Sequence, residues 1–120
     1  MSYTESAIKI LERATEILEP RGAWTKGTYA LSREKTSVPS DSPRAVCFCA
    51  LGAIQRARFD LGFHADYSSE VTYETNPAIE AMCQVIDDRD IDEWNDISSR
   101  RKGEVIAKMH EAISILKGDK

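Results

Sequence analysis

Two cysteines placed one residue apart, Cys47 and Cys49, are the residues of this chain best suited to covalent chemistry. His64 and Asp96 follow them, which reproduces the order of nucleophile, base and orienting residue in papain-like hydrolases. A cysteine-dependent hydrolase that uses Cys47 or Cys49 with His64 and Asp96 is therefore one hypothesis. The local sequence around a papain-type nucleophile is absent, and the order of residues alone is a weak signal.

The apolar stretch that holds these cysteines, AVCFCALGAI (45–54), is also typical of a buried helix. Residues two apart on a helix point about 200° away from each other, so Cys47 and Cys49 would not share a metal ion. Zinc ligation together with Cys83, His64 or His110 lacks the paired spacing of known sites. Because free cysteine is among the most buried residue types, we expect a core role, with no metal and no cofactor.

Aromatic and polar residues in two separate segments form the second candidate site. Trp24 and Tyr29 lie in WTKGTYAL, and Trp94, Asn95 and Asp96 form a WND motif before the last predicted helix. Aromatic side chains with polar tips favour the walls of small-molecule or peptide grooves. The alternative is structural, with the tryptophans sealing the core and the Asn and Asp side chains binding backbone amides.

A run of cations, Arg100, Arg101 and Lys102, follows this motif at the start of the last predicted helix. The helix dipole disfavours cations there, and a bound anion would relieve the conflict. A phosphate or nucleotide site at Arg100 and Arg101 is therefore a third hypothesis, against a solvated face paired with the acidic segment 87–96.

That acidic segment also resembles a calcium-binding loop in part. Asp88, Asp90 and Asp92 occupy the first, third and fifth positions of the EF-hand pattern. Glu93 replaces the glycine of position six and Ser99 the glutamate of position twelve, so the sequence favours a solvated acidic loop.

Composition narrows the class of protein. The 120 residues are 42% hydrophobic and 30% charged, which suits one domain, 1–120, with a modest core. The net charge of −4 argues against nonspecific binding to nucleic acid or anionic membranes. No stretch is long and apolar enough to span a membrane, the first residues do not form a secretory signal, and three cysteines suggest reduced thiols. We expect a cytoplasmic protein.

The periodicity predicts a mainly α fold of about four helices packed around a central buried helix. The first helix begins with Ser2 and Glu5 in capping-box spacing and ends before Pro20. The central helix spans about 43–61, a third helix starts at Pro77, and Ser98 or Ser99 caps the last. A short turn of helix is expected around Ile91 and Trp94, and a β-ribbon around 27–39 pairs 28–32 with 35–38.

Taken together, WTKGTYA (24–30), AVCFCALGAIQRA (45–57) and WNDISSRRKGEVIAKMHEAI (94–113) resemble a family of small uncharacterised bacterial and phage proteins. That family shows Trp-Thr-x-Gly, a Cys-x-x-Gly-Ala-Leu-like helix and Trp-Asn-Asp before a closing helix. Here Ile54 replaces the usual leucine, SSRRK replaces a Pro-Gly-Arg-Thr-like link, and residues 62–90 lie outside the resemblance. The resemblance implies a bacterial or phage cytoplasmic context and no particular reaction.

The interpretation that the sequence favours is a small, non-catalytic binding protein. Its ligand would be a protein partner or a small molecule near Trp24, Trp94 and Asp96, and it could serve as an accessory protein of a phage or mobile element. A homodimer would add buried area to a domain of this size.

Overall fold

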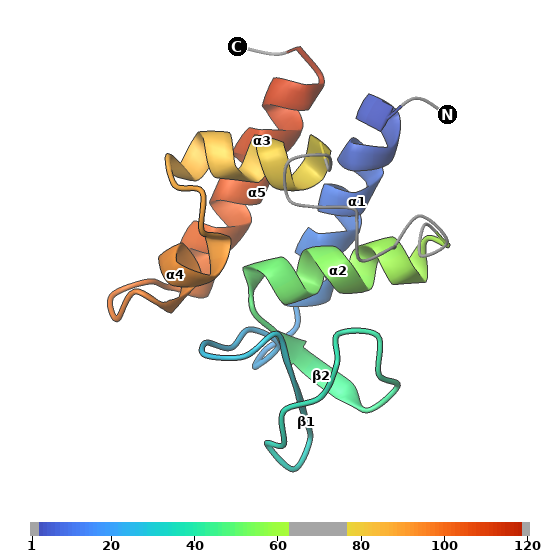
Figure 1. Ribbon diagram of the computed structural model, residues 1–120, viewed down its shortest axis with the longest axis vertical. Helices are drawn as coiled ribbons and strands as arrows, with labels where there is room; N and C mark the ends of the chain where they lie inside the picture. The colour runs from blue at the N-terminus through green and yellow to red at the C-terminus, as the bar shows by residue number, and fades with distance from the viewer. Residues whose placement is uncertain (1–2, 63–76, 119–120) are drawn as a thin grey trace.

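The chain folds as helices around a shared core, with a small β-ribbon at one end (Figure 1). The structure is a computed structural model and describes residues 3–62 and 77–118. Within these ranges there are five helices and a two-stranded antiparallel ribbon, which confirms the mainly α class. In chain order the elements are α1 (Tyr3–Leu18), β1 (Ala30–Ser32), β2 (Ala45–Phe48), α2 (Ala50–Asp60), α3 (Pro77–Ile86), α4 (Ile91–Asp96) and α5 (Lys102–Leu116).

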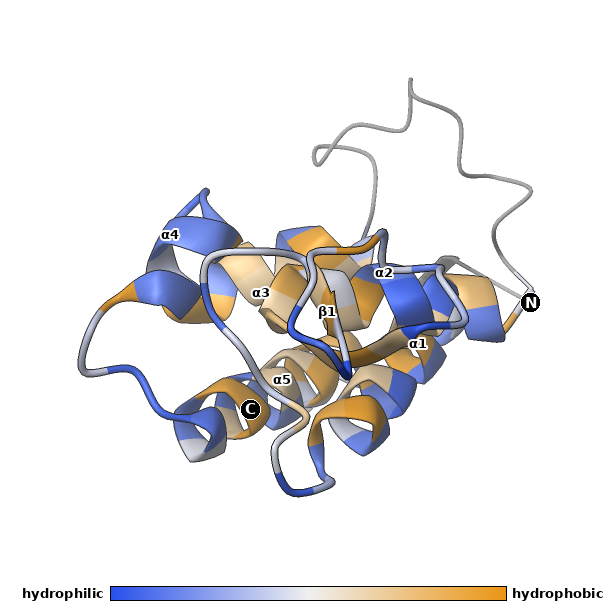
Figure 2. Cartoon of the chain, turned by 90° about the horizontal axis from the view of Figure 1, so that it is seen from below, coloured by the Kyte–Doolittle hydropathy of each residue, from blue (hydrophilic) through white to orange (hydrophobic). Residues whose placement is uncertain are grey.

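The core lies where α1, α2, α3 and α5 meet. Helix α1 contributes a stripe at three- and four-residue spacing, Ala7, Leu11, Ala14 and Leu18, each no more than 1% exposed. The ribbon lies at the end of the molecule opposite the first turn of α1 and the last turn of α5 (Figure 1). Figure 2 shows α3 as largely hydrophobic and α4 as largely hydrophilic, so α4 presents a polar surface beside the core. No helix in the described ranges has the length and apolarity to cross a bilayer.

The central helix is shorter than the sequence predicted. α2 starts at Ala50, not near residue 43, because 45–48 is a strand and Cys49 is the extended N-cap, with φ −80° and ψ 177°. Val46, Cys47 and Phe48 tolerate a strand well, and a short run that is apolar on all sides does not distinguish strand from helix. The burial of the helix and of both cysteines is confirmed, since Cys47 and Cys49 are 6% and 2% exposed.

The ribbon forms in the predicted region, and β1 has a second partner that the sequence did not predict. β1 lies inside the expected segment, and its second partner is β2, in the register Ala30↔Phe48 and Leu31↔Cys47. The segment predicted as the partner, 35–38, also lies against β1: Leu31 and Ser37 form an isolated antiparallel bridge, the Val38 amide donates to the Ala30 carbonyl at 3.1 Å, and the Ser32 amide donates to the Thr36 carbonyl at 2.9 Å. Residues 45–48 are apolar on all sides and were predicted as part of a helix, so the sequence did not indicate them as a strand partner of β1.

The other helix ends test the capping predictions. α3 begins at Pro77 as predicted, and α4 provides the short helix expected around Ile91 and Trp94. α5 begins at Lys102, with Arg101 as the N-cap, so the expected cap at Ser98 or Ser99 is wrong. The Glu104 carboxylate accepts a 2.9 Å hydrogen bond from the Arg101 amide, which stabilises the start of α5. Ser2 lies outside the described residues.

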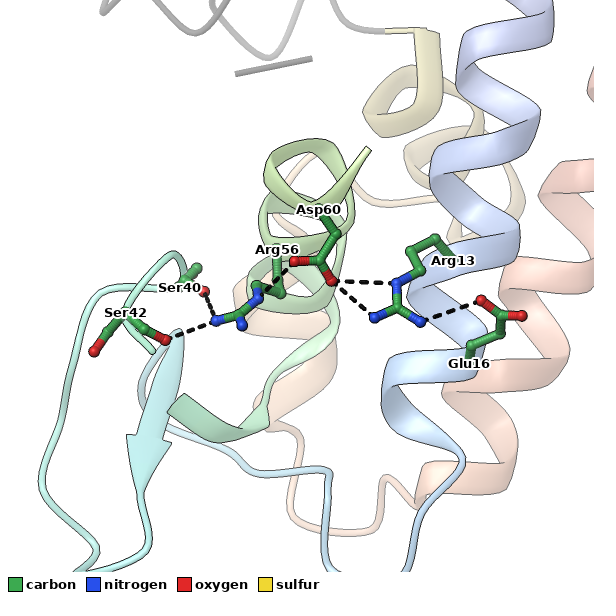
Figure 3. Close-up of polar contacts among 6 residues, drawn as sticks. All are labelled: Arg13, Glu16, Ser40, Ser42, Arg56 and Asp60. Atoms are coloured by element: carbon green, nitrogen blue, oxygen red, sulfur yellow. Dashed lines mark hydrogen bonds and ion pairs between the residues drawn. The ribbon is translucent and has the colours of Figure 1, made fainter. Parts of the chain in front are cut away.

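Asp60 and Arg56 of α2 together hold α1 and the loop before β2 against α2 (Figure 3). Asp60 Oδ2 accepts hydrogen bonds of 2.9 and 3.2 Å from Arg13 of α1, and Asp60 Oδ1 accepts one of 3.0 Å from Arg56 of α2. Arg56 also donates to the carbonyl oxygens of Ser42 and Ser40, at 2.7 and 3.2 Å. These contacts fix the loop before β2, and therefore β2 itself, relative to α1 and α2.

Gly52 allows the loop before β1 to lie directly on the first turn of α2. The Tyr29 carbonyl oxygen accepts a 3.2 Å hydrogen bond from the Cys49 amide and lies against the Gly52 Cα. A Cβ built on Gly52 would overlap that oxygen, and backbone cannot move aside as a flexible side chain can. The position of Tyr29 therefore depends on a glycine at residue 52.

This contact predicts that Gly52→Ala destabilises the protein although alanine is the better helix former. Overpacking in an interior typically costs about 1–3 kcal/mol, and backbone displacement places this site at the upper end. The control is Gly103→Ala in α5, where the added Cβ meets nothing within 4 Å beyond the adjacent residues and the backbone of its own helix, and where helix propensity favours alanine. Urea denaturation followed by circular dichroism measures both variants. A Gly52→Ala protein as stable as the wild type would contradict the packing described here.

Candidate functional site

A hollow of about 290 Å³ lies where the loop after α1, the start of α2 and the side of α4 meet. Its lining residues are Gly27, Thr28, Tyr29, Cys49, Asp92 and Asp96. Asp92 and Asp96 are four residues apart, so they share one face of α4. The hollow therefore combines two carboxylates, a thiol and an aromatic side chain that is 45% exposed.

Short-range capping places α4 in this position. Asp90 is the N-cap of α4 and accepts a 2.9 Å hydrogen bond from the Glu93 amide, while Asp88 accepts one of 2.9 Å from the Asp90 amide. At the other end, the Arg100 guanidinium lies 4.1 Å from the Trp94 ring centroid and donates to the Trp94 carbonyl at 3.0 Å. The acidic residues that resembled a calcium loop thus build the helix start.

Asn95 connects α4 to the other two segments that line the hollow, the loop after α1 and the start of α2, although it does not line the hollow itself. It is fully buried, and its Oδ1 accepts hydrogen bonds from the Trp24 indole Nε1 at 2.7 Å and from the Ala50 amide at 2.9 Å. Its Nδ2 donates to the Thr25 carbonyl at 3.1 Å and to Asp96 Oδ1 at 3.0 Å. One amide thereby joins the loop after α1, the start of α2 and the end of α4.

Asp96 and a neighbouring lysine anchor the loop wall. Asp96 Oδ1 accepts a 3.0 Å hydrogen bond from the amide of Gly27, whose φ of +81° suits a glycine. The Lys26 ammonium donates to the carbonyl oxygens of Ile97 and Ser98, at 2.7 and 3.2 Å, and lies 5.4 Å from the Trp24 ring centroid. Lys26 therefore points toward the turn after α4 and not toward the carboxylates of the hollow.

Cys49 is held in its protonated form. Its Sγ accepts a 3.3 Å hydrogen bond from the Gly52 amide and contacts Asp92 Oδ1 at 3.8 Å. The start of a helix usually lowers the pKa of a thiol. Here burial, together with the nearby charges of Asp92 and Asp96, outweighs the amide hydrogen bond and raises the pKa to about 12. A neutral thiol at pH 7 is a poor nucleophile.

Asp92 carries an unfavourable charge. Burial raises the pKa of its carboxyl above the ordinary value, and the negative charges of Asp90 and Asp96 raise it further. Hydrogen bonds from Cys49 and Tyr29 act in the opposite direction without cancelling the shift. Within the described ranges, no lysine, arginine or histidine forms an ion pair with Asp92 or Asp96.

The hydrolase residues are only partly brought together. Cys49 and Asp96 both line the hollow, but the Asp96 carboxylate bonds to Gly27 and Asn95. Cys47 does not line the hollow, and its Sγ lies 4.0 Å from the Leu31 carbonyl oxygen within the ribbon. His64 lies outside the described residues, so the hydrolase hypothesis stays a prediction.

Of the residues predicted to contact a ligand, Tyr29 and Asp96 line the hollow. Trp24 and Asn95 lie behind it as supports, and Trp94 is buried in the core. Sequence reasoning missed Asp92 as a lining residue, although its four-residue spacing from Asp96 on a short helix was a usable signal.

Arg100 and Lys102, two of the three cations near the start of α5, contact different parts of the chain. Arg100 bonds to the Trp94 carbonyl and to Glu104, and Lys102 donates to the Glu19 and Pro20 carbonyls, both at 3.0 Å. Arg101 is exposed. The phosphate-site hypothesis stays a prediction, although two of its three cations already have carbonyl partners. No group of three His, Cys, Asp or Glu in 3–62 and 77–118 is arranged to hold a metal ion.

The fold and the hollow define a small helical domain in which the three motif segments of the sequence meet at one place. A family model described as a family of unknown function (DUF6197) matches residues 2–115, so the chain belongs to that family. This match confirms the resemblance found from the motifs. No curated protein and no solved structure matches the chain.

The raised pKa of Asp92 predicts that Asp92→Asn stabilises the protein at pH 7. The folded pKa exceeds that of the unfolded chain, so the ionised carboxylate disfavours folding above the folded pKa and has no such effect below the unfolded pKa. We expect the Tm of Asp92→Asn to exceed that of the wild type at pH 7. The gain should disappear by about pH 3, near the ordinary aspartate range.

The matched control is Glu93→Gln, which removes a charge from an exposed neighbour on the same helix. Differential scanning calorimetry at both pH values measures the two variants. An Asp92→Asn protein that melts below the wild type at pH 7 would contradict the unfavourable charge.

Proposed function

We propose that this protein is a non-catalytic binding protein whose hollow holds the cationic head of a small organic molecule, an ammonium or guanidinium group. The observation that carries the proposal is the pair of carboxylates, Asp92 and Asp96, which line the hollow without a basic partner among the described residues. A cation between them would favour the ionised form of both and form charge-assisted hydrogen bonds.

Two basic residues close in sequence to the lining residues support this proposal by what they contact. Lys26 directly precedes Gly27 and Arg100 follows Asp96 by four residues, yet both donate to backbone carbonyl oxygens. Lys26 and Arg100 therefore do not neutralise the carboxylates of the hollow. A bound cation would do so.

The size and the aromatic wall favour a small organic cation. The volume of about 290 Å³ lies just below the range for small-molecule sites, about 300–1,000 Å³, which suits the head group of a small molecule. Tyr29 offers a half-exposed ring beside the carboxylates, and such rings attract ammonium and guanidinium groups by about 0.5–1 kcal/mol at exposed sites.

The state of Cys49 supports binding over covalent catalysis. A nucleophilic cysteine works as a thiolate, whereas burial and two neighbouring carboxylates raise the pKa of this thiol to about 12. In the proposal, Cys49 contributes a neutral wall and a hydrogen-bond donor to Asp92.

The test is a titration of the ¹⁵N-labelled protein with agmatine and putrescine, followed by backbone amide shifts. We expect saturable shifts at Gly27, Tyr29 and Asp96, with a dissociation constant between about 10 µM and 1 mM. Asp92→Asn should weaken binding about tenfold, the effect of losing about 1.4 kcal/mol, and Glu93→Gln should leave it unchanged. Binding is also expected to weaken as the pH falls through the raised pKa of Asp92, because protonation removes the charge of that carboxylate.

The neutral analogue 1,4-butanediol, which matches putrescine in length, and sodium chloride at equal ionic strength serve as ligand controls. Equal shifts with putrescine and butanediol, or equal affinity in the wild type and Asp92→Asn, would overturn the proposal. So would the absence of saturable shifts with both cations.

A further inference from the structure

We propose that Asn95 is the positioning residue of this hollow, and that its side-chain amide transmits occupancy of the hollow to the Trp24 indole and the start of α2. The inference rests on the proposed cation site. It assigns a role to a residue that does not itself line the hollow.

The four partners of Asn95 fix the orientation of its amide. Oδ1 receives two donors, the Trp24 indole and the Ala50 amide, and Nδ2 faces two acceptors, the Thr25 carbonyl and the Asp96 carboxylate. A rotation by 180° would place donors against donors and acceptors against acceptors. Only one orientation satisfies all four contacts, so the amide acts as a rigid link between its partners.

The link ends at a carboxylate of the hollow. Asp96 uses Oδ1 for the Asn95 amide and for the Gly27 amide, at 3.0 Å each, and its Oδ2 has no hydrogen-bond partner within the described ranges. The carboxylate is thus held from behind by its first oxygen while the second stays available to a cation. Without Asn95, the carboxylate and the loop wall would lose this common support.

Binding of a cation in the hollow should therefore change the hydrogen bond between the Trp24 indole and Asn95. A cation that draws on the Asp96 carboxylate weakens the Asp96 contact with Asn95 Nδ2 and changes the polarisation of the whole amide. The Trp24 indole N–H, which donates to Oδ1 of the same amide at 2.7 Å, reports this change without touching the ligand. A residue that only stabilised the core would show no such response.

The experiment compares two tryptophan variants by agmatine titration. Trp24→Phe keeps an aromatic ring and removes the indole donor to Asn95. The control is Trp94→Phe, which changes the residue next to Asn95 in α4. It removes an indole that packs in the core against Arg100. We expect Trp24→Phe to weaken agmatine binding about 3- to 10-fold, the usual effect of one lost hydrogen bond, and Trp94→Phe to change it less than about twofold.

The second readout is the indole ¹H–¹⁵N cross-peak of Trp24 in the wild-type protein. It should shift during the titration with the same dissociation constant as the Gly27 amide. If Trp24→Phe does not fold, this cross-peak decides the question alone.

Unchanged agmatine affinity in a folded Trp24→Phe, or a Trp24 cross-peak that stays fixed while Gly27 shifts, overturns the positioning role and leaves the cation site standing. Absence of agmatine and putrescine binding in the wild type overturns the cation site, and the positioning role with it.

Discussion

The buried amide of Asn95 is the interaction on which the arrangement of this protein depends. An amide without partners in the interior costs roughly 1–3 kcal/mol by protein mutational data, so its four contacts must form together. The partners lie 70 and 71 residues away in the loop after α1 and 45 residues away at the start of α2, and one is the adjacent Asp96. Satisfying one side chain therefore fixes how three separate segments meet.

Several basic side chains of this protein donate hydrogen bonds to backbone carbonyl oxygens. Lys102 donates to the last carbonyls around the end of α1, Arg100 to the end of α4, Lys26 to the turn after it, and Arg56 to the loop before β2. Carbonyls at helix ends lack intrahelical partners, so these contacts stabilise the fold. Among the described residues, no ion pair reaches Asp92 or Asp96, and this supports the proposal of a cationic ligand.

The sequence predicted the features that depend on local pattern. The buried stripe of α1, the Pro77 start of α3, the short helix at Ile91 and the burial of both cysteines follow from periodicity, capping and residue type. The resemblance also identified the segments that meet at Asn95. It did not say that they meet, since contacts over 45 to 71 residues leave no local trace in one sequence.

What could not be predicted depends on tertiary pairing. Residues 45–48 have no preference strong enough to reveal a strand, and β1 supplies the pairing that decides it. Likewise, Arg101 rather than a serine caps α5 because Glu104 bonds to its amide and Arg100 is held by α4. The role of Asp92 depends on the approach of Cys49 and Tyr29 from elsewhere in the chain.

The most direct test of the central claim is hydrogen exchange at the Trp24 indole. Its N–H is bonded to a fully buried oxygen, so this account predicts exchange only through unfolding, with protection equal to that of the Ala50 amide on the same oxygen. Exchange of the Trp24 indole at the rate of an unprotected tryptophan, while core amides of α1 remain protected, would contradict it.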